Sequence, residues 1–265
     1  HPDIRPNLLQ HAQGYGADLT AAVGSGNEFN PIDMSGIGHG THVTGMIGAV
    51  TNNGQGIVGG MPYRVKIMPL KIFGADGSTT SLIFFNAVKF AINNGAHVLN
   101  MSLGNITFQP NSDPQVQQAV ANAVAAGITV VTVTGNASGG SNGAEINGQS
   151  LTVLPAMYAT SPGVIGVGSF DTTTGNKSYF SHYSRTYGEI AAPGAENGQT
   201  GLYSTLPLKL SGYGRLSGTS QAAPLVSAAA ALTIGIIRDA YNYVPTPAEV
   251  ERLILLGSVK SPQLT

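Results

Sequence analysis

The sequence contains no cysteine and no tryptophan, and only 9% of its residues carry a charged side chain. The absence of cysteine excludes disulfide bonds, thiolate metal sites and a cysteine nucleophile. Twelve lysines and arginines stand against 13 aspartates and glutamates, so the chain lacks the basic excess that binds nucleic acid. We expect no apolar run to reach the length of a membrane span. We therefore expect neither nucleic acid nor a membrane as a partner.

Apolar residues and glycine are abundant instead. Hydrophobic residues make up 42% of the chain, which is enough for a large core, and 36 glycines predict many tight turns. A length of 265 residues is within the range of one α/β domain. The composition thus favours a single domain over residues 1–265.

Helical and strand patterns alternate along the chain. Residues 128–134 are uniformly apolar or small, which is typical of a strand buried on both faces. The alternation predicts an α/β fold, a parallel sheet with helices on both faces. In such sheets reactive groups gather at the carboxyl ends of strands, where residues 100–104 and 134–136 are expected. Helices are predicted at 41–50, 81–94, 113–126, 222–237 and 246–256, and strands at 65–72, 98–103, 128–134 and 163–168.

Two short motifs carry residues suited to catalysis. Residues 218–224 read Gly-Thr-Ser-Gln-Ala-Ala-Pro and place a hydroxyl nucleophile, Ser220, at the start of an apolar helix. Residues 38–43 read Gly-His-Gly-Thr-His-Val and offer His39 as a base. Each alone could be structural, a small serine in a packing surface or a histidine at a helix start. A metal site at the two histidines is disfavoured because a third ligand is missing.

Both motifs resemble the blocks Gly-His-Gly-Thr-His-Val and Gly-Thr-Ser-Met-Ala-Ala-Pro of the subtilisin-like serine protease (subtilase) family. The resemblance covers nearly the whole chain and implies a subtilisin-like three-layer fold and a secreted, extracellular endopeptidase. It implies that Ser220 attacks the peptide carbonyl and that His39 relays the proton. Asn136, in Val-Thr-Gly-Asn at 133–136, matches the family's oxyanion-hole asparagine.

The resemblance also implies a cleft that binds polypeptide substrates. In the family an extended peptide adds to a strand by main-chain hydrogen bonds. The matching residues here are small or apolar, which implies a preference for apolar or aromatic P1 residues. The alternative is that Leu103 and Leu154 are simply core residues. The implied substrate-binding residues are Ser102, Leu103, Gly104, Thr134, Gly135 and Leu154.

A structural calcium ion is implied by the match of Asp3 to a family ligand and by an oxygen-rich loop at 50–57. Calcium takes six to eight oxygen ligands from carboxylates, amides and carbonyls. The implied ligands are Asp3, Val50, Asn52, Gln55 and Ile57.

Three residues depart from the family's pattern. Gln221 stands where the family usually has methionine, beside the nucleophile, and this change is expected to leave activity intact. His97 replaces the usual aspartate or valine, and His182 replaces asparagine. Structural roles are expected for both histidines.

The largest departure concerns the aspartate that orients the catalytic histidine. The family carries it at a strand end, a few residues before His-Pro-Asp, and this sequence begins with His-Pro-Asp. The resemblance therefore predicts that the acid and the first strand or strands lie outside this chain, and residues 260–265 also fall short of the family's usual end. Asp33 precedes His39 closely, but the family has an acid near there that lines the substrate cleft. No substitute for the missing acid is nominated.

Three explanations for the missing acid stay open. The segment could be a separate chain still bound after a nick, it could be lost, or the chain could be an inert scaffold. The first is favoured, a non-covalent N-terminal fragment carrying the aspartate, because loss of a central strand would expose two sheet edges. The alternative functions are a non-catalytic peptide-binding module or an inactive fragment. An esterase is disfavoured because its histidine usually follows the serine, which lies in Gly-x-Ser-x-Gly.

Overall fold

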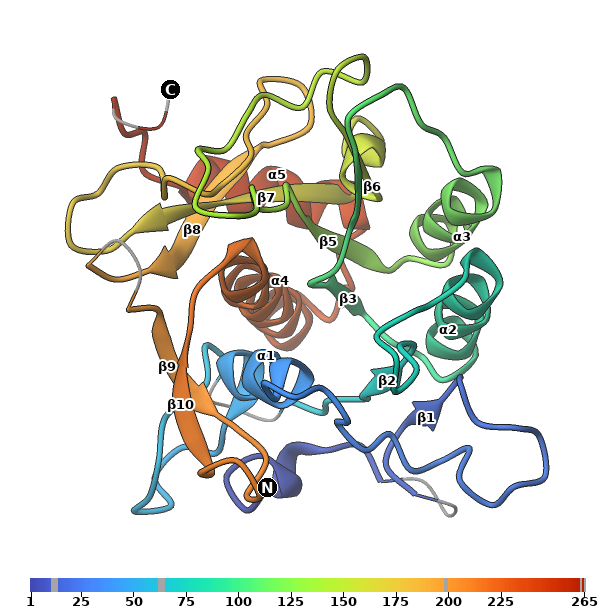
Figure 1. Ribbon diagram of the computed structural model, residues 1–265. Coiled ribbons are helices and arrows are strands. Elements are labelled where there is room, and N and C mark those ends of the chain that lie inside the picture. Colours follow the sequence, from blue (N-terminus) through green and yellow to red (C-terminus); the bar gives the residue numbers. More distant parts are fainter. Residues whose placement is uncertain (11–13, 62–64, 198–199, 263, 265) are drawn as a thin grey trace.

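The computed structural model describes residues 1–10, 14–61, 65–197, 200–262 and 264. Its centre is a parallel sheet of four strands in the order β3-β5-β7-β8 (Figure 1). Every residue of β5 is buried, as the uniformly apolar segment predicts. The strands are β3 (Val98–Met101), β5 (Thr129–Val133), β7 (Val164–Asp171) and β8 (Ile190–Ala195).

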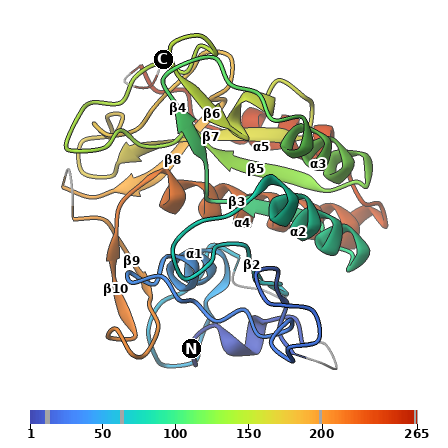
Figure 2. The same ribbon diagram turned by 45° about the vertical axis from the view of Figure 1, so that its right-hand side comes forward.

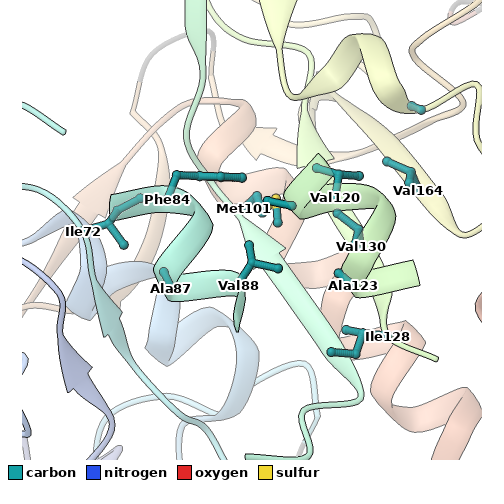
Figure 3. Packing of buried hydrophobic residues seen from close by; sticks show 12 residues of the cluster. Ile72, Phe84, Ala87, Val88, Met101, Val120, Ala123, Ile128, Val130 and Val164 are labelled. Carbon is teal, nitrogen blue, oxygen red and sulfur yellow. The ribbon is translucent and has the colours of Figure 1, made fainter. Parts of the chain in front are cut away.

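Helices cover both faces of this sheet. The side chains of β5 alternate, so Val130 packs in a core with α2 (Ser81–Asn93) and α3 (Pro114–Ala125). Figure 3 shows this core, and α2 and α3 lie side by side in Figure 2. Val131 and Val133 pack in a second core with α4 (Thr219–Tyr241). The three-layer α/β fold is therefore confirmed. The remaining helices α1 (His39–Gly48) and α5 (Pro247–Gly257) pack against α4.

Local signals explain where the helices begin. Asp113 caps α3 by accepting hydrogen bonds from the backbone N–H groups of Gln115 and Val116, both at 3.0 Å. Thr246 and Glu249 form a capping box at α5. Gly95, with φ of 69°, follows α2 in the left-handed conformation expected after a helix. The helices predicted from the pattern are all present, with ends shifted by a few residues.

The strand predicted at 65–72 is only partly formed. Within it β2 (Leu70–Lys71) pairs in parallel with β1 (Ala17–Asp18), and Ile67 bridges Leu8. Among the described residues, neither β1 nor β2 pairs with the four-stranded sheet. Two further pairs of strands are antiparallel. β4 (Asn105–Thr107) pairs with β6 (Thr152–Leu154), and β9 (Leu202–Thr205) pairs with β10 (Tyr213–Leu216). Short 3-10 helices lie at Arg5–Asn7 and Ala156–Tyr158.

The α4 helix corrects the expectation that no apolar run reaches membrane-spanning length. Its 23 residues are long and apolar enough for a span by length and composition. Half of its most apolar window is buried, and it contacts all four strands of the sheet. The core helix of a globular domain passes the same test, so this is weak evidence for a membrane span.

The carboxyl ends of β3 and β5 meet at one edge of the sheet. The register pairs Met101 with Thr132, so the two strands end side by side. Residues 102–104 and 134–136 therefore both follow the sheet at this edge, as expected.

Candidate active site

Ser220 is the second residue of α4 and is half-buried. Gly218, just before the helix, has a φ of 154°. A Cβ atom on Gly218 would lie 3.0 Å from Gln221 Oε1 and 3.3 Å from Asn136 Nδ2. Glycine is therefore favoured at this turn chiefly for its backbone conformation, and a side chain would also crowd Gln221 and Asn136.

Two hydrogen bonds hold Ser220 against the end of β3. Ser102 Oγ donates to the Ser220 carbonyl at 2.9 Å, and Ser220 Oγ donates to the Ser102 carbonyl at 3.3 Å. Asn100 Nδ2 in turn donates to Ser102 Oγ at 2.9 Å, and Ser227 Oγ donates to Asn100 Oδ1 at 2.9 Å. Asn100 was expected at this edge of the sheet, but its contact with Ser227 was not predicted, because a polar residue in an apolar helix gives no signal of what it faces. This network fixes the start of α4 to the sheet.

Asn136 follows β5 and anchors the same helix start. Its Oδ1 accepts from Thr219 N at 2.9 Å and from Thr219 Oγ1 at 3.1 Å. Its Nδ2 lies near Gly218, and within the described part of the chain no hydrogen bond occupies it, so it can donate to another group. The first N–H groups of a helix lack partners within the helix and favour negative charge. Asn136 Nδ2 and the Ser220 N–H can therefore both donate to an oxyanion formed at Ser220.

His39 is the first residue of α1, and its N–H donates to Ser35 Oγ at 2.9 Å. Burial lowers the pKa of the His39 imidazole, and the charge of Asp33 opposes this shift. The ring is therefore neutral near pH 7, as a general base requires. Among the described residues, its ring nitrogens form no hydrogen bond with a carboxylate or with Ser220.

Asp33 is the carboxylate closest to His39 in the sequence, and it is engaged elsewhere. Its Oδ1 accepts from Ser35 N at 3.1 Å and Ser35 Oγ at 2.6 Å. Its Oδ2 accepts from Thr41 N and Thr41 Oγ1, both at 2.8 Å. Burial raises the pKa of Asp33, but these hydrogen bonds outweigh it and lower the pKa overall. Asp33 thus anchors the first turn of α1 instead of orienting the imidazole.

Replacing Asp33 with asparagine is expected to lower the free energy of unfolding by about 1 kcal/mol, because a helix-start acceptor is weakened. The loss of its charge should also lower the pKa of His39 and move the acid limb of the kcat profile to lower pH. Urea unfolding and a pH profile measure the two effects. Asp76→Asn is the matched control, because Asp76 accepts from Ser78 in an exposed turn without a helix. An acid limb that moves to higher pH would contradict this account.

A cavity of about 1810 Å³ lies beside His39. Both His39 and Ser102 line it, and Ser102 contacts Ser220, so the two motifs border the same region. The segments 65–77 and 94–104 line the cavity along their whole lengths. Among the described residues β3 pairs only with β5, so its other edge is unpaired. The apolar side chains around the cavity include Ile47, Ile67, Leu70, Val88, Leu99 and Met101.

The residues implied in substrate binding converge at the end of the sheet. Gly104 lies against β6, because a Cβ atom added to it would lie 3.3 Å from Val153 Cγ1. At Gly135, with φ of 87°, a Cβ would lie 3.1 Å from Ile106 Cδ1 and 3.4 Å from Val153 Cγ1. Ser102 and Leu103 are half-buried, whereas Thr134 and Leu154 are buried. The structure brings these residues together, and their role in binding stays a prediction.

His42 is fully buried and forms structural contacts. Its Nε2 lies 3.0 Å from the Leu202 carbonyl, and Ser204 Oγ donates to the His42 carbonyl at 2.8 Å. These bonds join α1 to β9. In the part of the chain that the structure describes, no three His, Cys, Asp or Glu residues form a metal-binding group.

The proposed calcium residues form a hydrogen-bonded junction around Asp3. Its carboxylate is fully buried and accepts from Asn53 Nδ2 at 2.5 Å, Ile57 N at 3.0 Å and Tyr213 Oη at 3.2 Å. Val50 contributes its N–H, which donates to the Asp3 carbonyl at 2.8 Å. Asn53 contacts Asp3, whereas Asn52 and Gln55 are exposed. With one carboxylate whose oxygens already have three donors, this arrangement does not fit calcium.

Calcium is accordingly expected to leave the melting temperature unchanged, and EDTA should have no effect. Asp3→Asn should lower the free energy of unfolding by about 1–3 kcal/mol, because buried donors lose a charged acceptor. Thermal unfolding with and without calcium measures both effects. The Ser220→Ala background is used because a protein without the nucleophile cannot digest itself. A melting temperature that rises with calcium in this protein, but not in its Asp3→Asn variant, would restore the calcium prediction.

The sequence matches the subtilase family over residues 1–262. It is 37% identical over 210 residues to subtilisin DY of Bacillus licheniformis, covering 79% of this chain and 67% of that protein. Thermitase of Thermoactinomyces vulgaris is 36% identical over 228 residues, with coverage of 85% and 72%. The chain thus spans about two thirds of the length of these relatives.

Solved structures agree with this result. A protease from Pseudoalteromonas arctica superimposes with a TM-score of 0.76 at 28% identity, covering 98% of this chain and 80% of that one. The self-cleaved protease domain of PatA gives 0.67 at 29% identity, with coverage of 83% and 75%. Together with the placement of Ser220 at the start of α4 and of Asn136 beside it, these matches show that the chain belongs to the subtilase family of subtilisin-like serine proteases.

Proposed function

We propose that this chain acts as a single-domain serine endopeptidase. Ser220 Oγ attacks the carbonyl carbon of a peptide bond while His39 takes its proton and passes it to the departing amine. Water then hydrolyses the acyl-enzyme. Asn136 Nδ2 and the Ser220 N–H stabilise the oxyanion. The observation that carries this proposal is the anchoring of the Asn136 amide to Thr219, directly beside Ser220.

We infer that the triad aspartate is supplied from outside these 265 residues, by a non-covalently bound fragment. Asp33 is committed to Ser35 and Thr41, and among the described carboxylates none bonds to the His39 ring. The cavity beside His39 and the unpaired edge of β3 support an extended apolar segment at this place. The similar PatA protease domain was solved in a self-cleaved form.

The proposed substrates are polypeptides with apolar or aromatic P1 residues. The residues implied in substrate binding, Gly104, Gly135 and Leu154 among them, offer no charged side chain for a basic or acidic P1 residue. An extracellular location is proposed from the relatives, and nucleic acid and membranes are not proposed as partners. No step of the proposed peptide hydrolysis involves calcium.

A rival function is a peptide-binding module that does not cut. The hydrogen bond from Ser220 Oγ to the Ser102 carbonyl favours it, because the hydroxyl is not paired with His39. The endopeptidase function requires that the Ser220 hydroxyl rotate toward His39 when the substrate binds.

Hydrolysis of casein separates the two functions. The endopeptidase predicts cleavage by the purified protein with every co-purifying fragment retained, and none by Ser220→Ala or His39→Ala. Ester hydrolysis without casein hydrolysis would point to an esterase. Binding of casein peptides without cleavage would support the binding module.

A further inference from the structure

His182 lies behind the segment that carries Asn136. It follows β7 and is only 2% exposed. Its N–H donates to the Gly135 carbonyl at 3.0 Å, and Thr134 Oγ1 donates to the His182 carbonyl at 2.7 Å. Ala137 N donates to the Phe180 carbonyl at 2.8 Å. The segment around His182 thus runs alongside residues 134–137.

The imidazole of His182 packs against this segment. A Cβ on Gly135 would lie 3.4 Å from its Cδ2 atom, so the ring packs directly against the peptide before Asn136. Its Nδ1 accepts from Ala144 N at 3.0 Å, which requires an unprotonated Nδ1 and places the proton of the neutral ring on Nε2. The ring therefore joins the Ala144 loop to the oxyanion segment.

The surroundings favour the neutral ring. Burial lowers the pKa of His182, and the charge of Lys177 acts in the same direction. Lys177 Nζ is fixed by donating to the Ser178 and Ser181 carbonyls at 3.1 and 2.9 Å. Glu145 is a further charged residue nearby, and its backbone bridges Tyr183. Protonation at Nδ1 would set a donor against the Ala144 N–H and break the junction.

We propose that His182 is a positioning residue, whose neutral ring holds the Gly135–Asn136 peptide so that the Asn136 amide points at the oxyanion. It does not touch the reacting atoms. The proposal rests on the proposed function in one respect, the oxyanion role of Asn136. It assigns a role in catalysis to a histidine that is otherwise a buried structural residue.

Two substitutions separate positioning from packing. His182→Leu keeps a similar volume but removes the acceptor for Ala144. In His182→Asn the side-chain oxygen can take the place of Nδ1 without titrating. We expect about a 10-fold lower kcat in His182→Leu with KM within twofold, and kcat restored to within threefold in His182→Asn. The acid limb of log kcat should be steeper in the wild type, where His39 and His182 must both be neutral, than in His182→Asn.

NMR of the Ser220→Ala protein supplies a readout that does not depend on activity. A ¹⁵N-histidine spectrum should show the Nε2–H tautomer for His182. The Ala144 amide and the Asn136 side-chain amide should shift with the titration of His182. Absence of both shifts would overturn the positioning role even if casein is cleaved. If casein is not cleaved, the proposed function fails, and these shifts alone decide the positioning claim.

A wild-type kcat in His182→Leu, with casein cleaved normally, would also overturn the positioning role and leave the proposed function intact. If His182→Leu does not fold, His182→Asn still decides the matter, because an acid limb as steep as in the wild type would contradict the proposal.

Discussion

Asn136→Asp is expected to lower kcat by about 10²–10³-fold with little change in KM, the range known for the corresponding asparagine of subtilisin and not a value derived from this structure. The carboxylate would still accept from Thr219, so the start of α4 stays anchored. The Nδ2 donor is lost, and it is this donor that would stabilise the oxyanion. Kinetics on a peptide ester and a peptide amide measure the change.

Thr219→Val is the matched control for this prediction. It removes the hydroxyl contact to Asn136 Oδ1 at 3.1 Å but keeps the backbone N–H contact at 2.9 Å. We expect less than about a 10-fold loss, because the amide donor is retained. If Thr219→Val costs as much as Asn136→Asp, anchoring of the helix start, and not donation to the oxyanion, is what Asn136 provides.

Glu189→Gln is expected to remove a loss of stability at alkaline pH. Burial raises the pKa of Glu189 to about 8, and the negative charge of Glu251 adds to the shift. Glu251 also accepts a hydrogen bond from Gly163 N. Because the folded pKa lies above the unfolded value of 4.5, the folded state holds the extra proton, and stability falls as pH rises from 4.5 through about 8.

The contribution of Glu189 to the free energy of unfolding should fall by about 1–3 kcal/mol over this window, after allowance for solvent around a half-buried pair. In Glu189→Gln the fall should disappear, and Glu251→Gln should reduce it by removing the neighbouring charge. Urea unfolding of Ser220→Ala proteins at pH 5 and pH 9 measures this. Glu145→Gln is the control, since that side chain is exposed. A Glu189→Gln protein whose free energy of unfolding changes between these pH values as much as that of the parent protein would contradict the assignment.

The sequence predicted the central sheet and the helices well where the pattern was continuous. Residues 128–134 became β5 because every side chain there is apolar or small, and Asp113 marked the start of α3. The fourth strand, β8, was missed because Ile190–Ala195 is rich in alanine and glycine and contains Pro193. The strand at 65–72 was predicted too long, since apolar character alone does not provide a pairing partner.

The candidate site was predictable where a motif fixes both backbone and side chain. Ser220 and Asn136 lie where the motifs indicate, and the φ of Gly218 explains the first glycine of the serine motif. The role of Asp33 was not predicted, because its four donors come from Ser35 and Thr41 only once α1 is formed. Asn52 was chosen through the match of its loop to the family's calcium loop, whereas the contact of Asn53 with Asp3 depends on how this loop folds.

Labelling with a fluorophosphonate probe, followed by mapping of the modified residue and intact mass of every species present, tests the central claim most directly. The account predicts label on Ser220, reduced by His39→Ala, together with a co-purifying peptide that carries an aspartate beside the 27.1 kDa chain. Label on Ser220 in a sample with one species only would contradict the bound fragment. No label at all would contradict the endopeptidase.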